Sequence, residues 1–133
     1  MIYLDSSAVV KLVRREPGSD ALVAWLQAQG DVALVSSCLV EVEVPRAIRR
    51  YDPDSLQNVG PLIARLYKVE IDAKVRAMAA AYDDKRLRSL DAIHLATAEL
   101  LDTATHELAG LVAYDDRLLV AAQARGLKTV RPV

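Results

Sequence analysis

The segment M-I-Y-L-D-S-S-A-V-V-K, residues 1–11, places a carboxylate directly after a short apolar run. Ile2, Tyr3 and Leu4 are typical of a buried strand, and Asp5 follows at its end. Two serines and a second apolar run come next, which predicts a helix over residues 6–14. A charge is costly to bury without a partner. The end of this strand therefore needs an explanation beyond hydrophobic packing.

The rest of the chain alternates short apolar runs with longer helical patterns. Further strands are predicted at residues 32–35, 68–71, 111–113 and 128–130. Helices are predicted from Ser19 or Asp20 to 29, from Ser36 or Ser37 to 50, and at 55–67, 73–82, 89–101 and 116–125. Continuous apolar strands separated by helices favour a parallel sheet covered on both faces. We therefore predict one α/β domain over residues 1–133, a three-layer α/β/α arrangement with a four- or five-stranded parallel sheet.

Composition limits the possible classes of protein. The 133 residues carry 17 basic and 18 acidic side chains, a net charge of −1, so the basic excess common in nucleic-acid-binding domains is absent, although a local patch remains possible. A single cysteine excludes an internal disulfide. No leader-like segment opens the chain, and no apolar run approaches the length of a membrane span. We expect a cytoplasmic protein without a membrane association.

Carboxylates cluster where the predicted strands end or the helices begin. The relevant residues are Asp5, Glu41, Glu43, Asp91, Asp115 and Asp116. Because the carboxyl ends of parallel strands share one edge of the sheet, and ligands bind there, these acids are expected to converge.

Each acid also has a simpler explanation. Asp91 could complement a helix N-terminus, and either Asp115 or Asp116 could be an N-cap. Glu41 and Glu43 could be solvated. Taken together, these explanations leave several like charges close to one another, which would raise their pKa values and destabilise the fold.

A divalent cation resolves this conflict. Mg²⁺ and Mn²⁺ prefer oxygen ligands and need only a few carboxylates, while the lack of Cys and His clusters argues against a structural zinc site. Acidic pockets that hold such ions commonly cleave phosphodiesters, with the metal activating water.

Four segments, in order, resemble a PIN domain, and more narrowly the VapC toxins of bacterial VapBC toxin–antitoxin pairs. They are I-Y-L-D-S-S-A-V-V-K, S-S-C-L-V-E-V-E-V-P-R-A, L-D-A-I-H-L-A-T-A and V-A-Y-D-D-R-L, and the closing G-L-K-T-V-R-P also fits. The resemblance covers nearly the whole chain. It implies a PIN-like α/β/α fold, an acidic pocket for Mg²⁺ or Mn²⁺, and endoribonuclease activity on tRNA, ribosomal RNA or messenger RNA. It also implies inhibition by a VapB-type antitoxin and a homodimer.

The resemblance assigns roles to particular residues. Asp5 takes the first acidic position, with Ser6 and Ser7 as supporting hydroxyls. The family spacing of six residues after Ser37 selects Glu43 as the second acid. Glu41 lies about 200° away around the same helix, so the two cannot face one metal. Pro45 should kink this helix, which affects the direction of Glu43.

The remaining acidic positions fall on Asp91 and Asp115, with Asp116 as a further ligand or a helix cap. Asp5 and Asp91 are expected to hold the main metal directly, and Glu43 and Asp115 to act through water or a second ion. Water activated by the metal would attack the scissile phosphate, without a histidine base. His94, one turn after Asp91, could touch the site, but a packed core histidine is the favoured interpretation.

RNA binding beside an acidic pocket requires positive charge nearby. The candidates for contact with RNA or with the antitoxin are Arg46, Arg50, Arg88 and Arg117. The chain has no phenylalanine, one tryptophan and five tyrosines, which favours recognition of backbone and shape over base stacking.

Two other acid-pocket classes fit poorly. A haloacid dehalogenase-type phosphatase needs a second aspartate where Ser7 stands, and a receiver domain needs an acidic pair after the first strand. The alternative that stays open is a PIN-like module that binds RNA or a partner without cutting. All four acidic positions are filled, which favours an enzyme.

Overall fold

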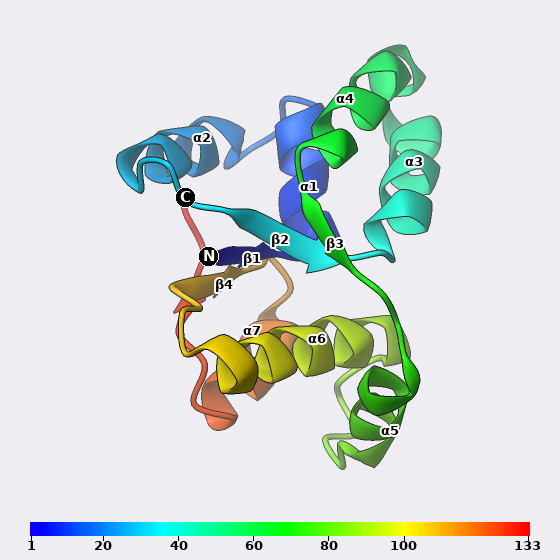
Figure 1. Cartoon of the computed structure of the whole chain (residues 1–133). Helices are drawn as coiled ribbons and strands as arrows, with labels where there is room; N and C mark the ends of the chain where they lie inside the picture. Colours follow the sequence, from blue (N-terminus) through cyan, green and yellow to red (C-terminus); the bar gives the residue numbers. More distant parts are fainter.

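The computed structural model, which describes all 133 residues, contains one five-stranded parallel sheet (Figure 1). Its strands are β1 (Ile2–Leu4), β2 (Leu34–Ser37), β3 (Tyr67–Val69), β4 (Gly110–Val112) and β5 (Thr129–Val130). They lie in the order β3-β2-β1-β4-β5, and every neighbouring pair is parallel. The predicted parallel α/β fold is confirmed, with five strands.

Helices cover both faces of this sheet (Figure 1). One face carries α1 (Ser6–Val13), α2 (Ser19–Ala28), α3 (Val40–Tyr51) and α4 (Val59–Ala64), with the short 3₁₀ helix η1 (Pro53–Asn58) before α4. The other face carries α6 (Ser89–Thr105) and α7 (Asp116–Ala124), and α5 (Ala73–Ala81) packs against α6. The result is the three-layer arrangement expected from the alternation of strands and helices.

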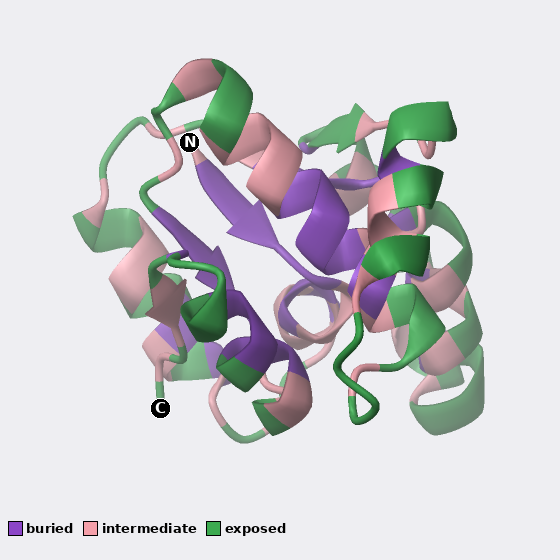
Figure 2. Ribbon diagram, turned by 90° about the horizontal axis from the view of Figure 1, so that it is seen from below, coloured by how far each residue is buried: buried purple, intermediate pink, exposed green.

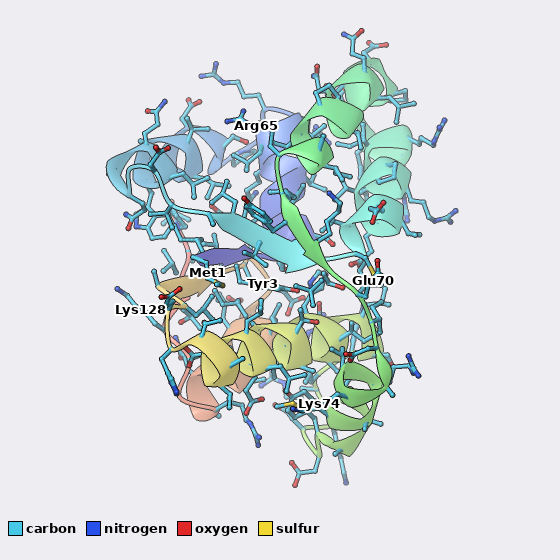
Figure 3. The ribbon with its side chains drawn as sticks, viewed as in Figure 1. Met1, Tyr3, Arg65, Glu70, Lys74 and Lys128 are labelled. Atoms are coloured by element: carbon cyan, nitrogen blue, oxygen red, sulfur yellow. The ribbon has the colours of Figure 1, made fainter.

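The apolar run of β1 is continuous because both of its faces are buried. Ile2 and Leu4 pack against α1, α3 and α4, whereas Tyr3 packs on the opposite side among residues of α6 and α7. This alternation follows the two-residue period of a strand. Figure 2 shows the central strands buried between helices whose outer faces are exposed, and Figure 3 shows Tyr3 on the side of the sheet that faces α6.

Two serines predicted to cap a helix lie instead at the end of β2. The Ser36 hydroxyl donates to the carbonyl of Leu4 at 2.6 Å, and the Ser37 N–H donates to the Tyr3 hydroxyl at 3.1 Å. These bonds satisfy the serines inside the sheet, so β2 continues through them. Helix α3 begins at Val40 and continues through Pro45 to Tyr51.

Two predicted helices also differ in extent. The segment predicted as one helix over residues 55–67 divides into η1 and α4, and its last residue, Tyr67, begins β3. Helix α6 runs four residues beyond the predicted end and stops at His106, whose φ of 54° is left-handed. A left-handed residue at this position is a common way for a helix to end.

The sheet has a topological switch between β1 and β4. From β1 the chain adds β2 and β3 on one side, and then β4 and β5 on the other. The connections that leave β1 and β4 therefore diverge at the carboxyl edge, which is where open α/β sheets bind their ligands.

No helix is both long and apolar enough to cross a lipid bilayer.

Candidate active site

Asp5 lies at this switch point and is only 3% exposed. It is the N-cap of α1, and its Oδ1 accepts hydrogen bonds from the Ala8 N–H at 2.9 Å and from the Ser7 hydroxyl at 2.6 Å. The Ser7 hydroxyl in turn accepts from the Tyr114 N–H, which ties the carboxylate to the end of β4. No protein group donates to Asp5 Oδ2. One oxygen of Asp5 is thus fixed by the fold, and the other remains available to a ligand.

The electrostatics of Asp5 reflect its surroundings. Burial raises the pKa of the carboxyl from its ordinary value of 3.8 to about 6, and the charge of Asp91 adds to the rise. Attraction to His94 and the hydrogen bonds from Ser7 and Ala8 act in the opposite direction without cancelling it. The folded chain therefore carries an ionised Asp5 at neutral pH at a cost in stability.

Glu43 reaches the same site from α3. Its Oε1 accepts a hydrogen bond from the Ser6 hydroxyl at 2.7 Å and lies 2.9 Å from His94 Nε2. Burial raises the pKa of Glu43, but these two hydrogen bonds and the attraction to His94 outweigh it, so the pKa is lowered overall. Glu41 is exposed on the same helix. Of the two glutamates that the helical spacing separates, Glu43 is the one that faces the residues after β1.

His94, on α6, is 1% exposed and connects Glu43 to the core. Its Nδ1 lies 2.7 Å from the Tyr3 hydroxyl, which accepts a hydrogen bond from the Ser37 N–H. A carboxylate only accepts, so Nε2 carries the hydrogen toward Glu43, and in the neutral ring Nδ1 accepts from the Tyr3 hydroxyl. With the hydrogen on Nε2, the imidazole ring makes a hydrogen bond with both Glu43 and Tyr3.

The interpretation of His94 as a core histidine was therefore incomplete. The side chain is buried as expected, but it also supports a carboxylate of the site. The signal that could have revealed this is chemical: both ring nitrogens of a buried histidine need partners, and the apolar helix around His94 offers none.

Asp91 and Asp115 complete the group of acids. Asp91 lies in the first turn of α6, half-buried, and its carboxylate makes no hydrogen bond with the protein. Burial raises its pKa, and the charges of Asp115 and Glu43 raise it further, while His94 and Arg117 lower it. Carboxylates from α3, α6 and the segment after β4 are thus near enough to repel one another.

Asp115 is the N-cap of α7 as well as a member of this group. Its Oδ1 accepts from the backbone N–H groups of Arg117 and Leu118, at 2.9 and 3.2 Å, and its Oδ2 lies 3.7 Å from the Arg117 guanidinium. Asp116 differs, because its side chain is 80% exposed and forms an ion pair with Arg131. The structure brings Asp115, and not Asp116, into the electrostatic neighbourhood of Asp91.

The donor set decides which metal the residues fit. No three His, Cys, Asp or Glu side chains are grouped closely enough to enclose an ion, so a fully protein-coordinated site such as structural zinc does not fit. The carboxylate oxygens without a protein donor include Asp5 Oδ2, Glu43 Oε2 and both oxygens of Asp91. Mg²⁺ is commonly held by one or two carboxylates and completes its shell with water. These residues therefore fit a hydrated Mg²⁺ or Mn²⁺ ion.

A basic cleft borders the acids. It has a volume of about 590 Å³ and is lined by the cationic residues Lys85, Arg86, Arg88 and Arg117, with Tyr114, Asp115 and Asp116 completing its wall. Two of the four predicted contact arginines thus lie beside the acids. Arg46 and Arg50 are exposed on α3 and do not line this cleft.

The sequence matches the PIN domain family over residues 2–124. The chain is 50% identical to Ribonuclease VapC35 of Mycobacterium tuberculosis over 132 residues, which covers 99% of this chain and 97% of that protein. It is 40% identical to Ribonuclease VapC46 of the same organism, over 98% of this chain and 97% of the relative.

Solved structures show the same fold at low sequence identity. The chain superposes on Mycobacterium tuberculosis VapC20, a sarcin-ricin loop cleaving toxin, with a TM-score of 0.71 and 16% identity, covering 99% of this chain and 100% of that one. It superposes on a chain of the Rickettsia felis VapBC2 complex, bound to a DNA fragment from its promoter, with a TM-score of 0.73 and 14% identity, over the full length of both chains.

The chain therefore belongs to the PIN-domain family. Its full-length identity to VapC35 and VapC46 places it among the VapC-type toxins, which confirms the resemblance seen in the four sequence segments.

Proposed function

We propose that this protein is a Mg²⁺- or Mn²⁺-dependent endoribonuclease that acts as the toxin of a VapBC-type pair. One observation carries the proposal: Asp5, Glu43, Asp91 and Asp115 come from four separate segments and meet at the carboxyl edge of a PIN-fold sheet. The VapC relatives at 50% and 40% identity are named ribonucleases, which supports the same chemistry.

The acids divide into two roles. Asp5 Oδ2 and Asp91 have no protein partner, and both pKa values are raised, so they gain most from a cation between them. Asp5 is held by Ser7 and Ala8, so its free oxygen has a fixed direction. We assign these two residues to metal binding. When bound, Mg²⁺ or Mn²⁺ would stabilise charge on the phosphate oxygens and lower the pKa of the attacking water.

Glu43 is suited to orienting water rather than to binding the ion alone. Ser6 and His94 both donate to Oε1, which fixes the carboxylate and keeps its pKa low, and no protein group donates to Oε2. An ionised carboxylate in this position accepts a hydrogen bond from water and directs it toward phosphorus. Asp115, whose Oδ1 caps α7, presents Oδ2 toward Arg117 and would act through a water molecule or through a second ion that offsets its charge.

The basic cleft supplies the binding energy for RNA. Four cations beside the acids allow the phosphates that flank the scissile bond to approach an otherwise repulsive site. We propose tRNA, ribosomal RNA or messenger RNA as the substrate. The structural neighbour VapC20 is a sarcin-ricin loop cleaving toxin, which supports RNA as the class of substrate.

A VapB-type antitoxin is the proposed inhibitory partner, supported by the fold shared with a chain of a VapBC complex. A homodimer stays a prediction, as does a cytoplasmic location where cellular RNA would be the target. The alternative, a PIN-like module that binds without cutting, is disfavoured because all four acidic positions are retained and Asp5 is kept buried at a cost in stability.

The test is direct. Purified protein is incubated with total RNA in Mn²⁺ or Mg²⁺, alongside an EDTA control and the variants Asp5→Asn and Asp91→Asn. We expect discrete fragments only with wild-type protein and metal. Cutting that persists in EDTA, or in both variants, would show that the metal mechanism is wrong. Binding of RNA without cutting under every metal condition would favour the non-cleaving module.

A further inference from the structure

A second recess borders the acids next to the basic cleft. This α1–α3 hollow has a volume of about 310 Å³, and its lining includes Val10, Ala47, Tyr51 and Tyr114 together with Ser6 and Glu43 of the site. Tyr114 also lines the basic cleft. One tyrosine thus separates two recesses, and both recesses open beside the catalytic acids.

The two recesses differ in chemistry. The basic cleft has four cations, whereas the hollow has one, Lys11. The Lys11 ammonium is already bonded to Glu16 at 3.0 Å and to the Pro17 carbonyl at 2.8 Å, and Glu43 adds negative charge to the same recess. A phosphate would therefore be repelled from the hollow, while an uncharged group would be accepted.

The hollow offers surfaces that suit a planar heterocycle. Tyr51, one of five tyrosines in the chain, lies at the end of α3 and is 61% exposed. Val10 and Ala47 provide apolar area, and the Lys11–Glu16 pair places a donor and an acceptor at the rim. Aromatic faces beside apolar walls and a few polar groups are the usual means of binding a nucleobase from a single strand.

Resting on the ribonuclease function proposed above, we propose that the α1–α3 hollow binds the nucleobase next to the scissile phosphate. The RNA strand crosses the acids at Tyr114, with its phosphates in the basic cleft on one side and this base against Tyr51 on the other. Recognition of backbone and shape, which the composition favours over base stacking, is then supplemented by one base that is read directly. The hollow sets the preference for the cleavage site.

A double-mutant cycle tests the proposal. The cleavage site is first mapped with wild-type protein on total RNA, and an oligonucleotide spanning it is synthesised with the natural base or an abasic ribose at each of the two positions flanking the cut. Cleavage is measured as kcat/KM for wild type, Tyr51→Ala and Tyr51→Phe. The matched control is Tyr67→Ala, at a similarly exposed tyrosine (70%) that lies on the edge strand β3.

Stacking of one base is worth about 1–3 kcal/mol, so Tyr51→Ala should reduce kcat/KM by about 5- to 150-fold, with Tyr51→Phe close to wild type and Tyr67→Ala unchanged. At one flanking position the abasic substrate should lower wild-type activity by a similar factor and have no further effect on Tyr51→Ala. Urea unfolding of each variant establishes that the fold is intact, as expected for exposed tyrosines.

Three results would overturn the inference, and they are distinguishable. Additive effects of Tyr51→Ala and both abasic positions would show that the base does not occupy the hollow. Unchanged cleavage by Tyr51→Ala, with weakened inhibition by the cognate antitoxin, would assign the hollow to the antitoxin. Wild-type protein that cuts no RNA would remove the proposed function itself, and this inference with it.

Discussion

Replacing Asp5 with asparagine should stabilise the protein at neutral pH while it abolishes RNA cleavage. Burial raises the pKa of the Asp5 carboxyl from 3.8 to about 6, so ionising this group in the folded chain costs about 3 kcal/mol, at about 1.4 kcal/mol per unit of pKa. Asparagine keeps an oxygen for the Ser7 and Ala8 hydrogen bonds and remains a good N-cap. The variant should therefore gain about 3 kcal/mol of unfolding free energy at pH 7.

The gain must depend on pH in a particular direction. The pKa of Asp5 is higher in the folded state than in the unfolded state, so the folded state binds the proton more tightly between about pH 4 and pH 6. Below this interval Asp5 is protonated in both states and carries no penalty. As the pH rises through the interval, wild type loses stability relative to the variant, and above pH 6 the difference is constant.

The assay is urea unfolding of both proteins in EDTA from pH 4 to pH 8, with Asp116→Asn as the control because the Asp116 side chain is 80% exposed. Added Mg²⁺ should stabilise wild type and leave Asp5→Asn unaffected. Equal stabilities at pH 7, or a difference that does not grow between pH 4 and pH 6, would refute the reasoning.

Three further predictions concern other residues of the site and of the basic cleft. His94→Leu removes the acceptor of the buried Tyr3 hydroxyl, so unfolding free energy should fall by about 1–3 kcal/mol and cleavage at least tenfold. His94→Gln, which retains an amide donor, should recover part of the cleavage rate, and equal rates for the two variants would contradict a role in holding Glu43. Asp115→Asn should lower the cleavage rate more than 100-fold, whereas Asp116→Asn should lower it less than threefold. The unfolding free energy of both variants should stay within about 0.5 kcal/mol of wild type, because asparagine preserves the N-cap at position 115 and Asp116 is exposed. If Asp116→Asn lowered cleavage more than Asp115→Asn, the two residues would have the opposite roles. Arg88→Gln should reduce the slope of log RNA affinity against log salt concentration by about one, while the variant Arg15→Gln, at an exposed residue outside the cleft, should leave the slope unchanged. If filter-binding titrations gave Arg88→Gln the same slope as wild type, the basic cleft would not bind RNA.

The sheet and most elements were predictable because their signals are local. The fully apolar run of β1 requires burial on both faces, and a parallel sheet covered by helices is the arrangement that provides it. The boundaries that failed depended on tertiary bonds. Ser36 and Ser37 have the composition of a helix cap, but the carbonyl of Leu4 and the hydroxyl of Tyr3 retain them in β2.

The site was predictable as a set of positions and less so as a set of contacts. A carboxylate that ends a central strand is conspicuous at Asp5, and topology alone brings Asp115 to the same edge. Helical spacing puts Glu41 and Glu43 on different faces of α3 but does not show which of them faces the site. In the structure the Ser6 hydroxyl donates a hydrogen bond to Glu43, which identifies Glu43 as the residue that faces inward. The function of His94 depends on an oxygen of Tyr3, 91 residues earlier in the chain, which no local pattern reveals.

The central claim is that Asp5 and Asp91 bind a divalent ion at the carboxyl edge of the sheet. The most direct test is the anomalous difference map of a crystal soaked in Mn²⁺, together with one of Asp91→Asn treated identically. The account predicts a manganese peak within bonding distance of Asp5 Oδ2 and an Asp91 oxygen, which is lost or much reduced in the variant. A peak remote from both carboxylates, or no peak at saturating Mn²⁺, would contradict it.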